Sequence, residues 1–252
     1  MPCTARQVEP EATLPLRMLQ RREANAQIVH DTLHRRPGWV LSYFLEIDRE
    51  PVGFGSVAIA GPWTGKPTAY ECYVVPQHRA LLFDLFEAFL DASQPAFLEF
   101  QTNDPLVDLL LHTYGREGVS ESIVFADALT SHLPAHGTSL RARTSQSEVH
   151  VARERRQGGG EWSLESGTET VATGGLLFHY NRPYTDVYME VGEPFRRRGY
   201  GAYLVQELKR LAYELGAIPA ARCSPSNLAS RRTLARAGFV PVGHIVNARL
   251  SR

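Results

Sequence analysis

The sequence contains few cysteines, almost no lysine and no net charge. Its three cysteines, Cys3, Cys72 and Cys223, are widely separated and form no CxxC pair. This spacing excludes a disulfide framework and provides no zinc motif, so no metal is expected. Lys66 and Lys209 are the only lysines, and every other basic residue is arginine. Arginine suits recognition of carboxylates and phosphates, although the base composition of a genome produces the same bias.

Long apolar runs are also missing. No stretch approaches the ~18 apolar residues of a membrane helix, and the first twenty residues carry charges and prolines rather than a signal-peptide core. We therefore expect a cytoplasmic protein with no membrane partner. Lys+Arg and Asp+Glu both number 27, so the formal charge is zero, which argues against a nucleic-acid partner.

The first half of the chain mixes helix and strand patterns. Residues 1–12 look irregular, and helical spacing follows over 13–36, in two pieces that end at Pro37-Gly38. The turn 48–51 lies between two β-rich runs and predicts a hairpin. We expect strands at 39–47, 52–60, 69–75, 96–101 and 122–126, and helices at 81–92 and 106–114, the latter closed by Gly115.

The second half repeats this order after a weakly periodic stretch. We expect strands at 148–153, 161–165, 170–180, 186–191, 220–224 and 239–246, and helices at 200–215 and 227–236. The repeated order predicts a mixed α+β fold with flanking helices, built as two similar units. We assign one domain to 1–130, a linker to 131–147 and a second domain to 148–252.

The segment between the strand 186–191 and the helix that follows it contains a short glycine motif. It reads Arg196-Arg197-Arg198-Gly199-Tyr200-Gly201. Glycines allow a ligand to approach the backbone, and the first N–H groups of a helix attract anions. The motif suits a diphosphate, but the same residues are also compatible with solvent-exposed arginines at an ordinary turn that binds no ligand. It is neither a P-loop nor a dinucleotide fingerprint.

With a second motif downstream, the second half resembles the GCN5-related N-acetyltransferase (GNAT) superfamily. Arg196, Gly199 and Gly201 fit that family's [Q/R]-x-x-G-x-[G/A] signature, after a strand that ends at Val191. Further along, Asn227 opens a helix that ends in Gly238-Phe239, as in the family's second signature. The resemblance covers roughly 149–246. The first half matches only as a degenerate copy, because its equivalent corner, residues 75–82, has no glycine.

The resemblance implies acetyl-CoA as acyl donor and a split between the strands 186–191 and 220–224. Residues implied to bind acetyl-CoA are Val191, Arg196, Arg197, Arg198, Gly199, Tyr200, Gly201, Ala202, Asn227 and Ser230. The family's usual catalytic pair is missing, since Leu234 stands where many relatives have a Tyr and Arg222 where some have a Glu. Glu190 and His179 are the substitutes we predict, and a water chain is an alternative base.

Three functions therefore compete. The first is an N-acetyltransferase whose partner is a small-molecule or peptide amine, acting as a monomer or homodimer. The second is an acyl-CoA-binding regulatory protein without transfer activity, which the two missing catalytic residues favour. The third is a nucleic-acid module that uses the arginine run, which the neutral charge disfavours.

Overall fold

The chain forms two compact units in the computed structural model, which describes residues 2–143 and 161–251. Unit 1 consists of Met1–Ser122 together with Gly243–Arg252, and unit 2 consists of Ile123–Val242. The predicted domains, 1–130 and 148–252, divide the chain differently, because its last ten residues belong to the first unit. No helix in the described part of the chain is long and apolar enough to cross a membrane.

Unit 1 begins with an antiparallel sheet. The predicted hairpin is present as β2 (Val40–Ile47) and β3 (Glu50–Ala58). Its two turn residues, Asp48 and Arg49, have φ of 50° and 72°, as a tight hairpin turn requires. The irregular start that we expected is wrong, since β1 (Cys3–Val8) pairs along β2. This edge strand is partly exposed and has few apolar residues, so its sequence carries little strand signal.

Helices cover this sheet. A 3₁₀ turn, η1 (Pro10–Thr13), leads into α1 (Leu14–Ala24), which ends where Asn25 takes a left-handed φ of 43°. The second piece of the expected helix pair is a 3₁₀ helix, η2 (Asp31–Arg35). Two further 3₁₀ turns, η3 (Gly61–Trp63) and η4 (Pro76–Leu81), precede β4 and α2. Apolar side chains of α2 (Leu82–Ser93) fill the main core of the unit.

Two parallel strands of unit 1 separate soon after they meet. They are β4 (Thr68–Val74) and β5 (Phe97–Gln101), and their register contains only Thr68↔Phe97 and Ala69↔Leu98. After β5 comes α3 (Pro105–Tyr114), which Asp104 caps by accepting a hydrogen bond from the Leu106 N–H at 3.0 Å.

Unit 2 repeats this arrangement. An antiparallel run joins β7 (Ser139–Ala142), β8 (Trp162–Ser166), β9 (Glu169–Leu177) and β10 (Tyr184–Val191). Then come η5 (Glu193–Phe195), α5 (Tyr200–Glu214), β11 (Ile218–Cys223) and α6 (Leu228–Arg236). Strand β7 lies within the predicted linker, which is therefore partly structured. The predicted strand at 148–153 lies outside the described residues. The mixed α+β class is confirmed.

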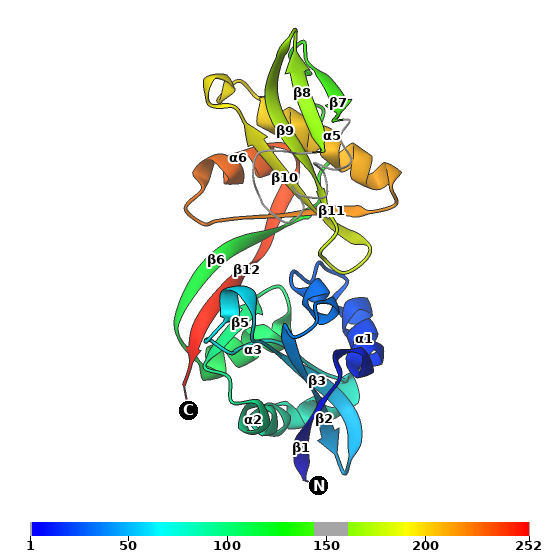
Figure 1. Cartoon of the computed structure of the whole chain (residues 1–252), viewed down its shortest axis with the longest axis vertical. Helices are drawn as coiled ribbons and strands as arrows, with labels where there is room; N and C mark the ends of the chain where they lie inside the picture. The colour runs from blue at the N-terminus through cyan, green and yellow to red at the C-terminus, as the bar shows by residue number, and fades with distance from the viewer. Residues whose placement is uncertain (1, 144–160, 252) are drawn as a thin grey trace. The chain divides into compact units, whose positions relative to one another are not determined.

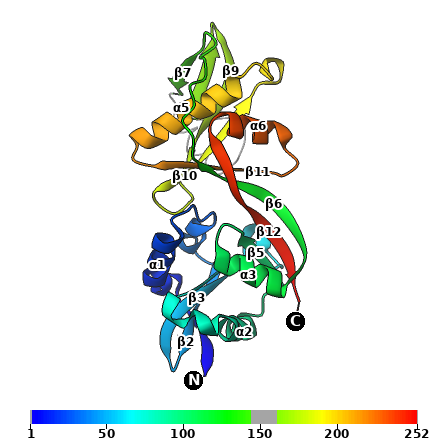
Figure 2. The same ribbon diagram turned by 180° about the vertical axis from the view of Figure 1, so that it is seen from behind.

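Two long strands, β6 (Gly115–Asp127) and β12 (Phe239–Leu250), each contribute to both units. They lie next to each other, green and red in Figures 1 and 2. In unit 1 the end of β12 pairs with β5, and in unit 2 the end of β6 pairs with β11. Each unit thus takes a central strand from the other half of the chain. Both strands are longer than predicted. We expected Gly115 only to close the preceding helix, but it is extended (φ −84°, ψ 146°) and is the first residue of β6.

A buried lysine fastens β6 to the helices of unit 2. Lys209 of α5 is 6% exposed, and its Nζ lies 2.5 Å from Asp127 Oδ1 at the end of β6. It also donates to the main-chain oxygens of Leu129, at 2.9 Å, and of Ala237, at 2.7 Å. The nearby carboxylate and the two hydrogen bonds compensate the buried charge.

The shared strands lead to a prediction for Ala248, a β12 residue 4% exposed in the core of unit 1. Ala248→Asp should lower the free energy of unfolding by about 3 kcal/mol, because it buries a carboxylate without a partner. Hydrogen exchange should accelerate in β5. Arg249→Asp, at the exposed neighbouring position, is the control and should change neither quantity much. Equal effects of the two changes would contradict a core position for the chain's last segment.

Candidate acyl-CoA site

The candidate site begins where β10 and β11 separate. These parallel strands pair only at Tyr184↔Ile218, Thr185↔Pro219 and Asp186↔Ala220, although β10 continues to Val191. On its other side β10 stays paired with β9 as far as Val191. Beyond Asp186, β10 no longer pairs with β11, so an extended ligand can bind along this side of the strand.

The arginine–glycine motif follows at the end of β10. Arg196 Nε donates to the Val191 main-chain oxygen at 3.3 Å, which closes the loop over η5. Arg197 has a φ of 64° and Gly199, the residue before α5, a φ of 91°. Residues other than glycine rarely adopt such φ values, so the backbone conformation at 199 favours glycine. Arg198 lies over the Phe195 ring at 6.0 Å, and all three arginines are exposed.

The main-chain N–H groups of this loop are available to a ligand. Those of Arg197, Arg198 and Gly199 have no acceptor among the described residues. The first N–H groups of α5 lack intrahelical partners as in any helix, and no side chain caps them. Consecutive unpaired N–H groups at a helix start, beside exposed guanidinium groups, attract a phosphate or diphosphate.

Gly201 also has a packing role that the motif alone does not reveal. A Cβ at this position would lie 3.0 Å from Val191 Cγ2 and 3.4 Å from Thr233 Cγ2. Glycine here lets the first turn of α5 pack closely on β10, and the neighbouring Ala202 is 4% exposed for the same reason. The loop is thus held near the end of the strand that leads into it.

One side chain of the predicted linker reaches the loop. The ring of His136 lies 5.9 Å from the Tyr200 ring, and its Nε2 would be 2.8 Å from a Cβ at Gly199. The stretch before it is fixed to α5, because Gln206 Oε1 accepts from the Leu133 N–H at 2.7 Å. Sequence reasoning missed His136, since nothing in a weakly periodic stretch indicates which helix it will cover.

The second motif forms the start and end of α6. Asn227 is the N-cap, its Oδ1 accepting from the Ser230 N–H at 3.0 Å. Leu234, where many relatives have a Tyr, is buried in the core of unit 2 at 5% exposure. Gly238 ends the helix with a φ of 90°, and a Cβ there would lie 2.0 Å from the Leu129 oxygen. Asn227 and Gly238 therefore have structural roles whether or not a ligand binds.

The predicted catalytic residues lie in different surroundings. His179 follows β9 in a loop rather than lying in the expected strand, and its Nε2 is 3.3 Å from Asp186 Oδ2. The same oxygen is 3.8 Å from Arg222 Nε. Asp186 is 6% exposed and is the last residue of β10 that pairs with β11. Sequence reasoning did not select Asp186, although a carboxylate among the apolar residues of a strand was the available signal.

The other candidates do not join this group. Glu190 is exposed near the end of β10, whereas the alternate side chains Val187, Met189 and Val191 pack in the core with α5. Burial raises the pKa of Cys223, which disfavours a thiolate nucleophile at the end of β11.

The sequence was compared with known protein families, curated proteins and solved structures. The model of the acetyltransferase (GNAT) family matches residues 106–239, just over half of the 252. The chain belongs to the GNAT family. No curated protein matches it.

Solved structures match the GNAT chain over its full length. An acetyltransferase of the GNAT family from Colwellia psychrerythraea has a TM-score of 0.74 at 16% identity, covering 98% of this chain and all of its own. A GCN5-related N-acetyltransferase from Sphaerobacter thermophilus has 0.61 at 16%, covering 99% and 97%. A tandem GNAT protein from the clavulanic acid biosynthesis pathway has 0.54 at 14%, covering 97% of both chains. At these identities the similarity shows the fold alone, and the expected tandem form is confirmed.

The matching corner of the first GNAT-like unit keeps the loop but not its glycines. Arg79 Nε donates to the Val74 main-chain oxygen at 3.1 Å, the same five-residue spacing as Arg196 and Val191. In this register Leu82 corresponds to Gly199 and Asp84 to Gly201. A carboxylate in the first turn of α2 would repel a diphosphate. Only the loop of unit 2 therefore has the features of the acyl-CoA signature.

A prediction for the second motif concerns stability. Gly238→Ala should lower the free energy of unfolding by about 2 kcal/mol or more, because it adds a clash with the Leu129 oxygen to the cost of a left-handed alanine. Gly216→Ala, at a φ of 69° with no atom within 4 Å of the added carbon, should cost about 1 kcal/mol. Chemical denaturation measures both, and equal losses would refute the close packing at Gly238.

Proposed function

We propose that the protein is an N-acetyltransferase that transfers the acetyl group of acetyl-CoA to a primary amine at unit 2. The observation that carries the proposal is the short register of β10 and β11, which ends at Asp186↔Ala220 although β10 continues to Val191, shortly before the glycine loop. A split of this kind suits the extended pantetheine arm, and the loop at its end suits the diphosphate. Membership of the GNAT family supports acyl-CoA as the donor.

In this proposal each predicted binding residue has a role. Backbone groups near Glu190 and Val191 hold the pantetheine arm and polarise the thioester carbonyl. N–H groups from Arg197 to Ala202 hold the diphosphate, with the exposed guanidinium groups beside them. Asn227 uses Oδ1 as a helix cap, so its side-chain NH₂ is the group that can donate to the ligand, next to Ser230.

The reaction we propose is direct. The amine nitrogen attacks the thioester carbonyl carbon, the C–S bond breaks, and the nitrogen loses a proton while the departing sulfur gains one. His179 is the proposed base, and its Nε2 lies 3.3 Å from the Asp186 carboxylate. Both groups lie where β10 and β11 part, whereas Glu190 is exposed farther along.

Two observations favour the alternative, an acyl-CoA-binding regulatory protein. Leu234, at the position of the usual acid, is an apolar residue buried in the core. Arg222, at the position of the usual base, is a cation that lies near Asp186. Release of free thiol from acetyl-CoA with a panel of amines separates the two functions. Tight acetyl-CoA binding without thiol release would support the regulatory protein.

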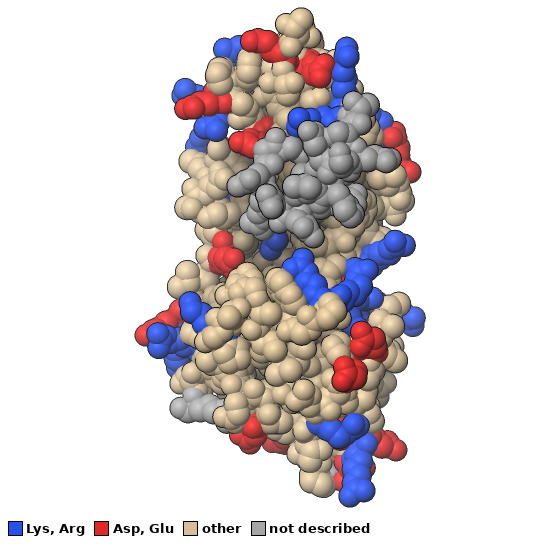
Figure 3. Space-filling view, in the orientation of Figure 1, with Lys and Arg blue, Asp and Glu red and all other residues tan. Residues whose placement is uncertain are grey.

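A nucleic-acid partner has less support. The face of the molecule in Figure 3 carries both basic and acidic side chains. The formal charge is zero, so no strong overall attraction to a polyanion is expected. The partner we propose is therefore a small-molecule or peptide amine.

The cradle is tested by calorimetry. Gly199→Trp should weaken acetyl-CoA binding at least about tenfold, because the ring occupies the space in front of the loop N–H groups and disturbs a φ of 91°. Gly167→Trp is the matched control, since it has a φ of 60° in the same unit and nothing within 4 Å. If both folded variants bind acetyl-CoA like the wild type, the proposed cradle is wrong.

The base is tested by kinetics. His179→Ala should lower kcat about 100-fold, with acetyl-CoA affinity kept, and added imidazole should restore part of the rate. Glu190→Gln should leave kcat within a few fold. The reverse pattern, with a large loss only at Glu190, would move the role of base to that residue.

A further inference from the structure

Unit 1 contains a solvent-open pocket in the split between its own parallel strands. Its cavity volume is small, about 20 Å³. The pocket begins directly after the last paired position, Ala69↔Leu98. Its polar walls include residues of the segment after α1, of β4 and β5, and of the start of α3, among them His30, Tyr70, Glu71, Glu99, Gln101 and Asp104.

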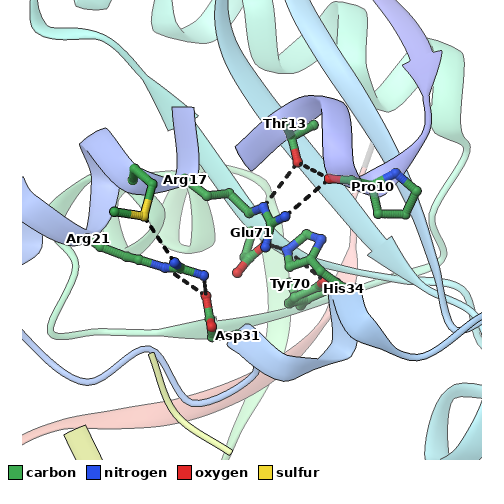
Figure 4. Close-up of polar contacts among 9 residues, drawn as sticks. Pro10, Thr13, Arg17, Arg21, Asp31, His34, Tyr70 and Glu71 are labelled. Carbon is green, nitrogen blue, oxygen red and sulfur yellow. Dashed lines mark hydrogen bonds and ion pairs between the residues drawn. The ribbon is translucent and has the colours of Figure 1, made fainter. Parts of the chain in front are cut away.

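The first acidic wall is Glu71 of β4, which is 4% exposed. Its Oε2 lies 2.6 Å from His34 Nε2, and the Tyr70 hydroxyl lies 3.3 Å from the same nitrogen, as Figure 4 shows. The buried Ser56 hydroxyl is a second polar group beside this carboxylate. Burial tends to raise the pKa of Glu71, but His34, the charge of Arg17 and the Ser56 hydroxyl together lower it.

The second acidic wall is Glu99 of β5, also 4% exposed. Its Oε1 lies 2.7 Å from His30 Nε2, and its Oε2 accepts from Trp63 Nε1 at 3.1 Å and from Asn247 at 2.7 Å. Burial would raise the pKa of this carboxyl, but the His30 hydrogen bond and its charge hold it lowered. The carboxylate is therefore ionised and fixed in position.

The third acidic wall is Asp104, the cap of α3. Its hydrogen bonds come from neutral groups, the Leu106 N–H at 3.0 Å and the Gln20 amide at 3.4 Å. No ion pair joins it to a cation among the described residues. Burial raises the pKa of Asp104, which shows that its negative charge is poorly compensated.

Two arginines lie near the pocket, and the charge of Arg17 helps to lower the pKa of Glu71. Arg17, 7% exposed, donates to Thr13 Oγ1 and to the Pro10 oxygen, both at 3.2 Å. Arg21 donates through Nε to Asp31 Oδ1 at 3.0 Å. Figure 4 shows this network beside Glu71 and His34. Neither arginine lines the pocket, and neither does a lysine, so its wall has three carboxylates and one imidazole.

We propose that this pocket of unit 1 binds a small organic cation through a primary ammonium group. An ammonium has three donors, and the buried carboxylates on two diverging strands and at the start of α3 offer acceptors from separate directions. Hydroxyl and amide groups of Tyr70 and Gln101 complete a polar wall. An anion is disfavoured by the same carboxylates. The inference is independent of acetyl transfer at unit 2.

Nuclear magnetic resonance can test the site without a known natural ligand. The chain has three tryptophans, so its spectrum contains three indole N–H signals, and that of Trp63 reports directly on Glu99. Ethylammonium chloride is the probe, and Trp63→Phe assigns the signal. We expect a saturable shift of the Trp63 signal, with half-saturation in the millimolar range for so small a ligand. Sodium chloride at equal concentration and ethanol, a neutral molecule of similar size, should give none.

Two variants make the result specific. Glu71→Gln should weaken the binding at least about tenfold, since it removes a charge at nearly constant shape. Asp104→Asn should also weaken it, and asparagine keeps the helix cap, so this variant serves if the first fails to fold. Glu50→Gln, at an exposed position, is the control and should bind like the wild type.

A shift that does not saturate, or equal binding by all variants, overturns the proposal. Acetyl-CoA affinity should be unchanged in Glu71→Gln, which separates this test from that of unit 2.

Discussion

The brief pairing of two parallel strands is the constraint on which both candidate sites depend. In unit 2 the register of β10 and β11 contains three positions, and in unit 1 that of β4 and β5 contains two. Strands that part so early leave backbone groups unpaired inside a sheet, and such groups must meet side chains, water or a ligand. Each split is therefore a place where something other than a strand has to be accommodated.

The fold can maintain these splits because each unit receives a strand from the other half of the chain. The end of β12 pairs with β5, and the end of β6 pairs with β11. One of the two diverging strands in each unit, β5 or β11, is therefore paired along its other edge. Lys209 adds a polar anchor, since its ammonium joins the end of β6 to α5 and to the end of α6. Neither unit is assembled from one continuous half of the sequence, and such distant pairings slow folding relative to local ones.

The sequence predicts local elements well and long-range partners poorly. Periodicity and turn residues located the hairpin, α2, α5 and α6, because these signals lie within a few positions of one another. The edge strand Cys3–Val8 escaped, since its conformation comes from pairing with β2 rather than from apolar alternation. The ends of β6 and β12 escaped for the same reason.

Candidate site residues follow the same rule. The Arg196–Gly201 motif is contiguous and could be found, whereas the approach of Asp186 to His179 depends on a loop that reverses the chain between β9 and β10. His34 and Glu71 are 37 positions apart and meet only because η2 covers β4. A motif search detects residues that act together in sequence. Contacts made by the fold require the structure.

A comparison of matching positions suggests how the two units came to differ. Arg79 and Arg196 make the same bond to the end of the preceding strand, and the last paired residues, Ala69 and Asp186, are then also equivalent. In this register Glu71 matches Tyr188 and Glu99 matches Ala221, so the carboxylates of unit 1 lie just beyond its last paired position, inside the split.

The same register places Asp84 where unit 2 has Gly201. Unit 1 therefore differs in two ways at once, because it lacks the glycines that expose backbone N–H groups and has acidic side chains in the split. Loss of a diphosphate site alone would leave the split free to fill with apolar residues, which cost less to bury than carboxylates. Two buried glutamates held in place by His30 and His34 instead indicate a polar occupant. The two proposed sites thus differ in ligand charge on one backbone framework, a cation in unit 1 and a diphosphate in unit 2.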